Sequence, residues 1–319
     1  MKNNMRKNVL FTIVFGLIIT ACARLLEGDP LPVEVGDYKP PISDTVKLTS
    51  DIGIDDPKSL GLAINCSASE SPENKKIEII DSLPVRFDLS KDMPPVKSQG
   101  IVGSCASFAT TYYMKSYQEK IQHNYAYNNY GKVMSPSYVY NQVKVSDCPT
   151  GSCIINNLSL LKREGAATWQ EFPYDGVTCH LQPNSQHKKL AEKNKIKAYY
   201  TVNSSDSTNV NYTKTKAIKS LLFKKIPVII GMSIDKDFSE GDKKTDSVFV
   251  YNSYDASKPY GRHAMLIVGY DDRLNAFKVI NSWGTSWGNK GYSYINYDFF
   301  DNTNANSQYV PEIYYAEDL

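Results

Sequence analysis

The chain has 319 residues with 36 basic and 34 acidic side chains, and this length predicts one large domain or two medium ones rather than one small core. Hydrophobic residues make up 41% of the chain and charged residues 22%, which excludes a wholly disordered protein. The net charge of +2 lacks the clustered basic excess that phosphate binding requires, so no nucleic-acid partner is expected.

The first 22 residues have the three zones of a secretory signal peptide. A basic head is followed by an apolar run over 9–19, which is shorter than the roughly 20 residues that cross a bilayer. The run ends in Ile19-Thr20-Ala21-Cys22, which resembles a bacterial lipobox. The resemblance implies acylation of Cys22, a membrane contact through the N-terminal lipid, and a place in the periplasm or on the cell surface. Ordinary signal-peptidase cleavage near Ala21 or Ala23 is the alternative, and it also predicts export.

The segment 23–82 is predicted to be a linker or a pro-segment. It is rich in proline, aspartate and serine and has few long apolar periodicities. If fully flexible, its ~60 residues would have an end-to-end distance of about 40 Å. It is either a tether or a cover for an active site, and the lack of a strong amphipathic helix favours the tether.

A candidate nucleophile stands at Cys105. Gly100, Gly103 and Ser104 predict a turn, and the pattern from 106 to about 120 predicts a helix. Cys105 is then at the helix N-terminus with Ser104 as its N-cap, where the helix dipole favours the nucleophilic thiolate. Alone this is weak evidence, because a free cysteine is commonly a small buried apolar group.

Further helices and strands are predicted in the order of an α+β protein, with a helical half at about 99–195 and a β-rich half at about 196–319. The predicted helices cover 135–144, 154–165 and 213–224; the predicted strands cover 199–202, 228–234, 249–251 and 292–297. The segments 203–212 and 235–259 are predicted to be mainly polar surface loops.

A β-hairpin is predicted over 261–280, with His263 opening its first strand and Asn281 following its second. The hairpin brings these two side chains together. A histidine oriented by an amide oxygen is what a cysteine nucleophile needs to form its ion pair. A single histidine at the start of a strand is more often structural, so the neighbouring motifs decide.

Three segments together resemble the signature blocks of the papain family of cysteine peptidases. They read Gln99-x3-Gly103-Ser104-Cys105, then Gly261-x-His263-Ala264-Met265-x-Ile267-Val268-Gly269-Tyr270, then Asn281-Ser282-Trp283-Gly284-x2-Trp287-Gly288-x2-Gly291-Tyr292. The blocks stand in the family's order, and the resemblance covers 83–319 as one peptidase domain.

The resemblance implies a papain-like fold, in which an active-site cleft separates a helical half from a β-barrel-like half. Cys105 would be the nucleophile, His263 the general base and then acid, and Asn281 the residue that orients the imidazole. Gln99 would form the oxyanion hole with the backbone N–H of Cys105, and Trp283 would shield the His–Asn hydrogen bond. This chemistry needs no cofactor and no metal.

The resemblance also implies a set of substrate-binding residues, which are Gly151, Ser152, Arg262, Ala264 and Trp283. The family usually has an aromatic residue where Ala106 stands and a cysteine where Val102 stands. Arg262 is unusual before the histidine, near the primary specificity pocket. These departures leave the chemistry intact and the substrate preference open, and no inhibitory-helix signature of plant and animal pro-regions is evident.

Four cysteines remain once Cys22 and Cys105 have been assigned, and they allow three complete pairings. They are Cys66, Cys148, Cys153 and Cys179. Export favours disulfides, and the family pattern suggests a bridge from the Cys148/Cys153 region to Cys179, with the partner left open.

Two further motifs carry less weight. The segment 284–288 matches a serine nucleophile elbow, but the strand predicted at 292–297 contradicts the strand–turn–helix setting that such an elbow requires. Cys179, His180 and His187 have no fourth zinc ligand at a normal spacing, so no metal site is predicted.

The leading hypothesis is an exported, lipid-anchored, monomeric cysteine endopeptidase that acts on peptide or protein substrates through a thioester acyl-enzyme. One alternative is a catalytically silent, membrane-anchored peptide-binding protein on the same fold, and another is an amine acyltransferase. The intact Gln99, Cys105, His263 and Asn281 favour the enzyme.

Overall fold

The computed structural model describes residues 48, 58–64, 66, 70–202, 212–241, 248–301 and 305–319. All of them belong to one compact unit, Lys39–Leu319. The expected signal peptide and Cys22 lie outside the described residues. Within the described ranges, no helix is long and apolar enough to cross a membrane.

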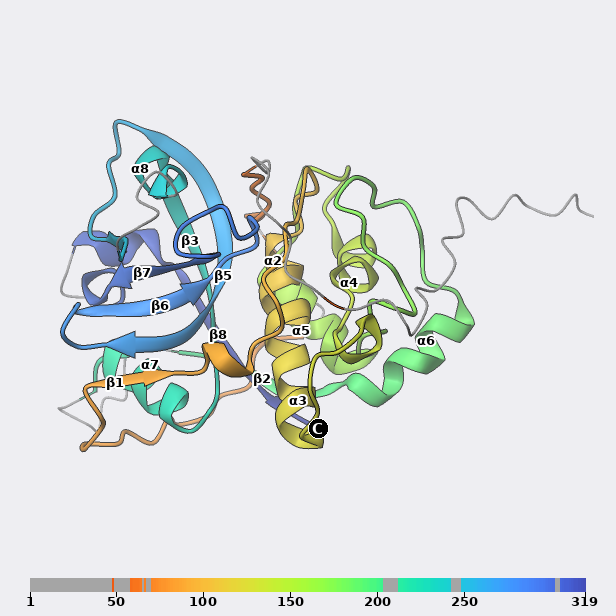
Figure 1. Cartoon of the computed structure of the whole chain (residues 1–319), viewed down its shortest axis with the longest axis horizontal. Helices are drawn as coiled ribbons and strands as arrows, with labels where there is room; N and C mark the ends of the chain where they lie inside the picture. The colour runs from red at the N-terminus through yellow and green to blue at the C-terminus, as the bar shows by residue number, and fades with distance from the viewer. Residues whose placement is uncertain are drawn as a thin grey trace, which may run out of the picture. The chain divides into compact units, whose positions relative to one another are not determined.

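One continuous helical stretch begins at the candidate nucleophile. It consists of α2 (Cys105–Ser107), the π-helix η2 (Phe108–Lys115) and α3 (Ser116–His123). Three more helices follow, which are α4 (Pro136–Val143), α5 (Ile154–Arg163) and α6 (Ser185–Ala191). Figure 1 shows α2 to α6 gathered on one side and most of the sheet on the other.

The sheet has the order β2-β8-β3-β5-β6-β7-β4, with β1 paired to β5. The strands are β1 (Arg86–Asp88), β2 (Ile196–Thr201), β3 (Val228–Asp235), β4 (Val250–Tyr251), β5 (Pro259–Asp271), β6 (Ala276–Ile280), β7 (Tyr292–Asn296) and β8 (Glu312–Asp318). Neighbours are antiparallel except for the β4–β7 pair. Within the described residues β2 and β4 end the sheet without pairing to each other, so the expected barrel-like half is an open sheet.

Two helices accompany the sheet, α7 (Lys214–Phe223), which packs on β1, β3 and β5, and α8 (Lys236–Ser239), which directly follows β3. Single-turn helices complete the described structure: η1 (Ser90–Asp92), η3 (Tyr130–Lys132), η4 (Glu192–Asn194), η6 (Tyr297–Phe299) and the slightly longer η7 (Ala305–Tyr309).

The α+β prediction is confirmed, and the three helices and four strands predicted outside the hairpin are found within a few residues of their expected bounds. The segment 235–259, predicted to be a polar surface loop apart from the strand at 249–251, also contains α8 and the first residue of β5. The predicted loop at 203–212 lies, except for its last residue, outside the described residues. Strand β8 was not predicted, because it forms only through long-range pairing with β2 and β3. Helix α6 was also missed, because this short helix relies on a capping box between Asn184 and His187 rather than on an apolar stripe.

Part of the segment 23–82, called the leader below, packs on this unit. The backbone N–H of Glu73 donates to the carbonyl of Tyr199, so that Glu73 pairs with the outer edge of β2. Further along, the N–H of Ile80 donates to the Ser220 hydroxyl on α7, just before the chain enters β1. The described leader residues therefore follow a defined path along the domain.

Candidate active site

The β5–β6 hairpin places His263 beside Asn281, as predicted. The imidazole Nε2 donates to the amide Oδ1 of Asn281 at 2.7 Å. Asn281 is itself fixed, because its backbone N–H donates to Gly291 and its carbonyl accepts from the Tyr113 hydroxyl. The Trp283 ring stacks on the imidazole with 4.5 Å between centroids. This buried indole keeps water away from the His–Asn hydrogen bond.

Cys105 faces the same strand from the helical side. It is the first residue of α2, and the backbone N–H of Ala264, next to His263, lies within hydrogen-bonding reach of its sulfur. The Nδ1 atom of His263 is buried, and it has no hydrogen-bond partner among the described residues. Ser104 holds the N-cap position, but its hydroxyl bonds to the Tyr174 hydroxyl rather than to the helix, which corrects the expected capping role.

Gln99 is fully buried next to this pair. Its Nε2 donates to the carbonyl of Val102 at 2.9 Å, and its Oε1 accepts from the Ser282 hydroxyl at 2.6 Å. These two bonds fix the plane of the side-chain amide. A carboxamide nitrogen carries two N–H donors, so one remains for an oxyanion beside the N-terminus of α2.

Burial sets the protonation of Cys105 and His263. It raises the pKa of the Cys105 thiol to about 12 and lowers the pKa of His263 to about 4, against the opposing effect of the Asn281 hydrogen bond. At neutral pH both groups are therefore uncharged in this structure. The helix dipole was expected to favour the thiolate, but desolvation of the buried sulfur is the larger effect here.

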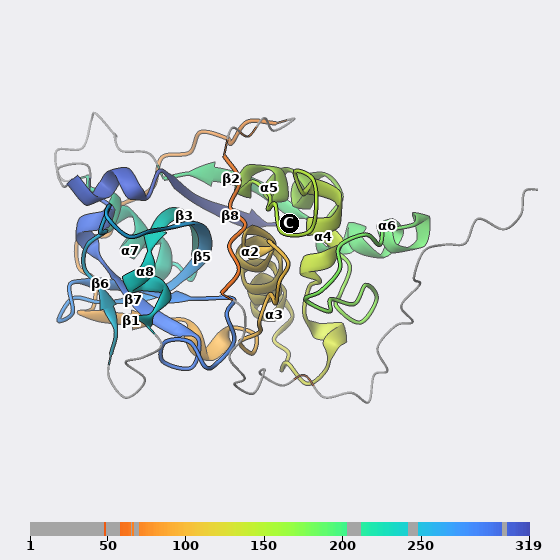
Figure 2. The same cartoon turned by 90° about the horizontal axis from the view of Figure 1, so that it is seen from above.

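A short piece of the leader, residues 58–63, lies across the site and is called the covering segment below. Figure 2 shows it in orange-red between β5 and α2. On the sheet side, the Tyr260 hydroxyl donates to the carbonyl of Lys58 and Trp283 Nε1 donates to that of Ser59. The same Trp283 ring stacks on His263, so the covering segment is bonded to the side chain that covers the imidazole.

On the helical side the covering segment binds Ser152 as a strand would. The N–H of Ser152 donates to the carbonyl of Gly61 at 2.9 Å, and its carbonyl accepts from the N–H of Ala63 at 3.2 Å. Leu62, between them, is buried, and a Cβ on Gly231 would come within 2.7 Å of its side chain. The backbone groups of Ser152, which was predicted to bind substrate, are therefore already bonded to the covering segment.

Two glycines, Gly61 and Gly151, allow this close approach. A Cβ on Gly61 would lie 1.9 Å from the carbonyl oxygen of Gly103, and a Cβ on Gly151 would lie 2.2 Å from that of Gly61. Gly103 precedes Cys105 by two residues. A side chain at Gly61 or Gly151 would therefore push the covering segment away from the backbone of the domain.

The other residues that were predicted to bind substrate, Arg262, Ala264 and Trp283, lie beside His263. Arg262 forms an ion pair with Glu312 at 2.5 Å, and burial raises the pKa of Glu312 against the effect of this arginine. Neither Glu312 nor the covering segment was predicted from the sequence. The apolar run 60–64 within a polar leader was an available signal for the segment, whereas nothing local indicated Glu312.

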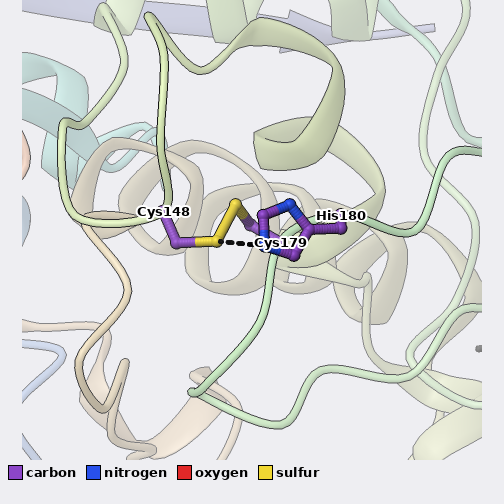
Figure 3. A group of neighbouring side chains, drawn as sticks. All are labelled: Cys148, Cys179 and His180. Atoms are coloured by element: carbon purple, nitrogen blue, oxygen red, sulfur yellow. Dashed lines mark hydrogen bonds between the residues drawn. A yellow bond between two sulfur atoms is a disulfide. The ribbon is translucent and has the colours of Figure 1, made fainter.

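The four remaining cysteines form two disulfides, Cys66–Cys153 and Cys148–Cys179. Figure 3 shows His180 beside the second bridge, with 3.8 Å between its Nε2 and the Cys148 sulfur. While oxidised, Cys148 and Cys179 are neither nucleophiles nor metal ligands, although their sulfurs and His180 are close together. Cys105 is the one free cysteine in the described part of the chain.

Neither of the other motifs forms a site. The segment 284–288 lies in turns that lead into strand β7, so the serine-elbow match is accidental. The His187 side chain caps α6 through the backbone N–H of Asn184 and packs on Phe172.

Comparison with known proteins agrees with this geometry. The profile of the family described as "Papain family cysteine protease" matches residues 83–312. The chain is 27% identical over 248 residues to an uncharacterised peptidase C1-like protein of Acanthamoeba polyphaga mimivirus, covering 74% of this chain and 76% of that one. It is 28% identical over 207 residues to a cathepsin L-like proteinase of Fasciola hepatica, covering 62% and 55%. The chain therefore spans about half the length of that second relative.

Solved structures show the same fold. Xylellain, a cysteine protease from Xylella fastidiosa, superposes with a TM-score of 0.64 at 22% identity, over 85% of this chain and 100% of that one. Bromelain from Ananas comosus, solved with the inhibitor E64, gives 0.53 at 18% identity, over 74% and 100%. The relatives and the fold agree with the match to the family profile. The chain therefore belongs to the papain family of cysteine proteases and is a cysteine-type peptidase.

Proposed function

We propose that this protein is an exported cysteine peptidase that hydrolyses peptide bonds with Cys105, His263 and Asn281. The observation that carries the proposal is the buried His263–Asn281 hydrogen bond, covered by Trp283 and adjacent to the thiol at the start of α2. The signal-like N-terminus and the two disulfides support export, and the lipobox pattern supports acylation of Cys22.

The reaction follows from the positions of these groups. His263 takes the proton of the Cys105 thiol, and the thiolate attacks the scissile carbonyl carbon. The free N–H of the Gln99 amide and the backbone N–H of Cys105 stabilise the resulting oxyanion. The imidazolium then protonates the departing amine, which leaves a thioester that water hydrolyses with His263 as base. Asn281 keeps the imidazole ring oriented throughout.

The covering segment supports the hypothesis that 23–82 includes an inhibitory pro-segment. It bonds to the backbone of Ser152 and lies against Gly103, close to Cys105. A substrate strand would need the same backbone groups. We therefore propose that the covered form is inactive and that displacement of residues 58–63 opens the site.

The first test is labelling of the full chain with an epoxysuccinyl thiol-protease inhibitor, followed by peptide mass mapping. We expect slow labelling confined to Cys105, and faster labelling once the covering segment has been displaced. A Cys105→Ala variant is the control. An uncovered protein that stays unlabelled would refute the peptidase and favour a silent binding protein, whereas transfer of the acyl group to an added amine in preference to water would favour an acyltransferase.

Acid is expected to favour the uncovered form. The pKa of buried His263 is about 4, against an ordinary value of about 6.5, so between these pH values the imidazole gains a proton only when water reaches it. At pH 5 this proton uptake favours uncovering by up to about 30-fold, and above pH 6.5 the effect falls below about 2-fold. Glu312 acts in the opposite direction, because its raised pKa favours the protonated, covered form in acid.

Hydrogen exchange of the amides of residues 58–63, corrected for intrinsic rates, measures this effect. Protection should be lower at pH 5 than at pH 7.5. A His263→Gln variant lacks the titrating group and should lose this trend. Equal protection of the unmodified protein at both pH values would contradict the argument.

A further inference from the structure

A disulfide follows the covering segment almost immediately. Cys66 stands three residues after Ala63 and is bonded to Cys153. Cys153 directly follows Ser152, whose backbone holds Gly61 and Ala63. The covalent bond and the hydrogen bonds therefore attach the same short stretch of leader to the same short stretch of the domain.

The order of these features along the chain matters. The covering segment precedes Cys66, whereas the backbone link to the domain runs through 70–82. A cut within 70–82 would free the segment in a chain that lacked the disulfide. Here the cut segment would stay attached beside its own binding site, at an effective concentration in the millimolar range for a short connection. The side chains of Lys75, which is ion-paired with Glu317, and Lys76 are exposed in this stretch and offer sites for trypsin.

We propose that the Cys66–Cys153 disulfide is a redox latch on the covered active site. While the disulfide is intact, cleavage within 70–82 leaves the site covered, and a dithiol reductant releases the segment. The proposal rests on the proposed function, because the site that is uncovered is the peptidase site. In an oxidising compartment the latch is closed by default.

A dithiol supplies both of the thiols that are needed to reduce the Cys66–Cys153 disulfide. Cys66 is partly exposed and Cys153 is buried, so the thiolate of the dithiol attacks the Cys66 sulfur and expels the Cys153 thiolate, which takes up a proton. The second thiol then attacks the mixed disulfide and releases Cys66 as a thiol. In total two electrons and two protons pass to the protein, and the dithiol becomes a disulfide.

The test uses the full chain cut by trypsin, with the cut at Lys75 or Lys76 verified by mass. Alkylation of Cys105 is then followed before and after treatment with dithiothreitol and desalting. We expect the cut, oxidised protein to react as slowly as the uncut protein, and reduction to accelerate the reaction by at least about 100-fold. Equal rates for the cut protein before and after reduction would overturn the latch.

Two variants separate this bridge from the other disulfide. Cut Cys66→Ser protein should lose the segment on gel filtration and react rapidly without reductant. The double variant Cys148→Ser/Cys179→Ser removes the bridge that joins two parts of the peptidase domain, and after cutting it should stay slow until it is reduced. If the cut double variant reacted rapidly before reduction, the slow reaction of the cut protein would come from the stability that disulfides give the whole domain, and not from the Cys66–Cys153 bridge.

The readouts also separate the latch from the proposed function. Alkylation reports uncovering without any need for catalysis, and peptide hydrolysis is measured on the same samples. Redox-dependent alkylation without hydrolysis would sustain the latch and refute the peptidase. Hydrolysis that is equally fast in oxidised and reduced cut protein would sustain the peptidase and refute the latch.

Discussion

Replacing Cys105 by alanine is expected to lower kcat for peptide hydrolysis by about 10⁶-fold, the scale seen when a catalytic nucleophile is removed. The change deletes one buried sulfur at the start of α2, so the fold should be retained. Steady-state hydrolysis of a fluorogenic peptide in the presence of reductant measures the loss, and hydrogen exchange verifies the fold.

The same assay ranks the supporting residues. Gln99→Ala removes an oxyanion donor and should lower kcat by about 10²- to 10³-fold with little change in KM. Ser282→Ala is the matched control. It removes only the hydroxyl that donates to Gln99 Oε1, so kcat should fall much less.

A second cysteine and histidine, Cys148 and His180, lie close together, and they provide a control for the assignment of Cys105 as the nucleophile. Cys148 lies next to His180 but is bonded to Cys179, so a Cys148→Ala/Cys179→Ala protein should retain turnover under reducing conditions. Turnover that survived in Cys105→Ala and vanished in this double variant would show that the nucleophile had been assigned wrongly.

Gly61→Ala is expected to open the site without any change to the catalytic groups. The new Cβ would meet the carbonyl carbon and oxygen of Gly103 at 2.2 and 1.9 Å, and these backbone atoms cannot rotate away. Overpacking of this kind costs about 1–3 kcal/mol, which corresponds to an increase of roughly 5- to 150-fold in the uncovered fraction. Once uncovered, residue 61 is in water, where alanine meets no clash.

The rate constant for labelling of Cys105 by the epoxysuccinyl inhibitor should rise by the same factor. Ile64→Ala is the matched control, because this neighbouring side chain is 59% exposed and its loss should leave the rate unchanged. A Gly61→Ala protein that folds normally and reacts at the unmodified rate would show that residues 58–63 do not limit access.

The sequence predicted the elements that local patterns control. The hairpin carrying His263 and Asn281 followed from two apolar runs and a polar turn, and the helix after Cys105 followed from its periodicity. The roles of Gln99 and Trp283 came from the resemblance, because no local pattern distinguishes such residues from an ordinary amide and an ordinary indole.

Long-range contacts could not be predicted in the same way. The covering segment depends on close approach of Gly61 to Gly103 and Gly151, which are distant in the chain. The partner of Cys66 was left open, because the resemblance suggested only that Cys148 or Cys153 bonds to Cys179, and only the folded path of the leader selects Cys153. The neutral state of Cys105 and His263 depends on their complete burial, which no single segment encodes.

The contact between Glu73 and β2 bears on how the processed protein behaves in solution. Strand β2 ends the sheet, and Glu73 pairs with its outer edge. Unpaired edge strands offer a row of hydrogen-bonding groups to other chains and promote aggregation. A processed form that kept residues 70–82 would retain this protection, whereas trimming to β1 would expose the edge. If the leader is cut as proposed, the position of the cut would therefore decide whether the edge of β2 stays paired.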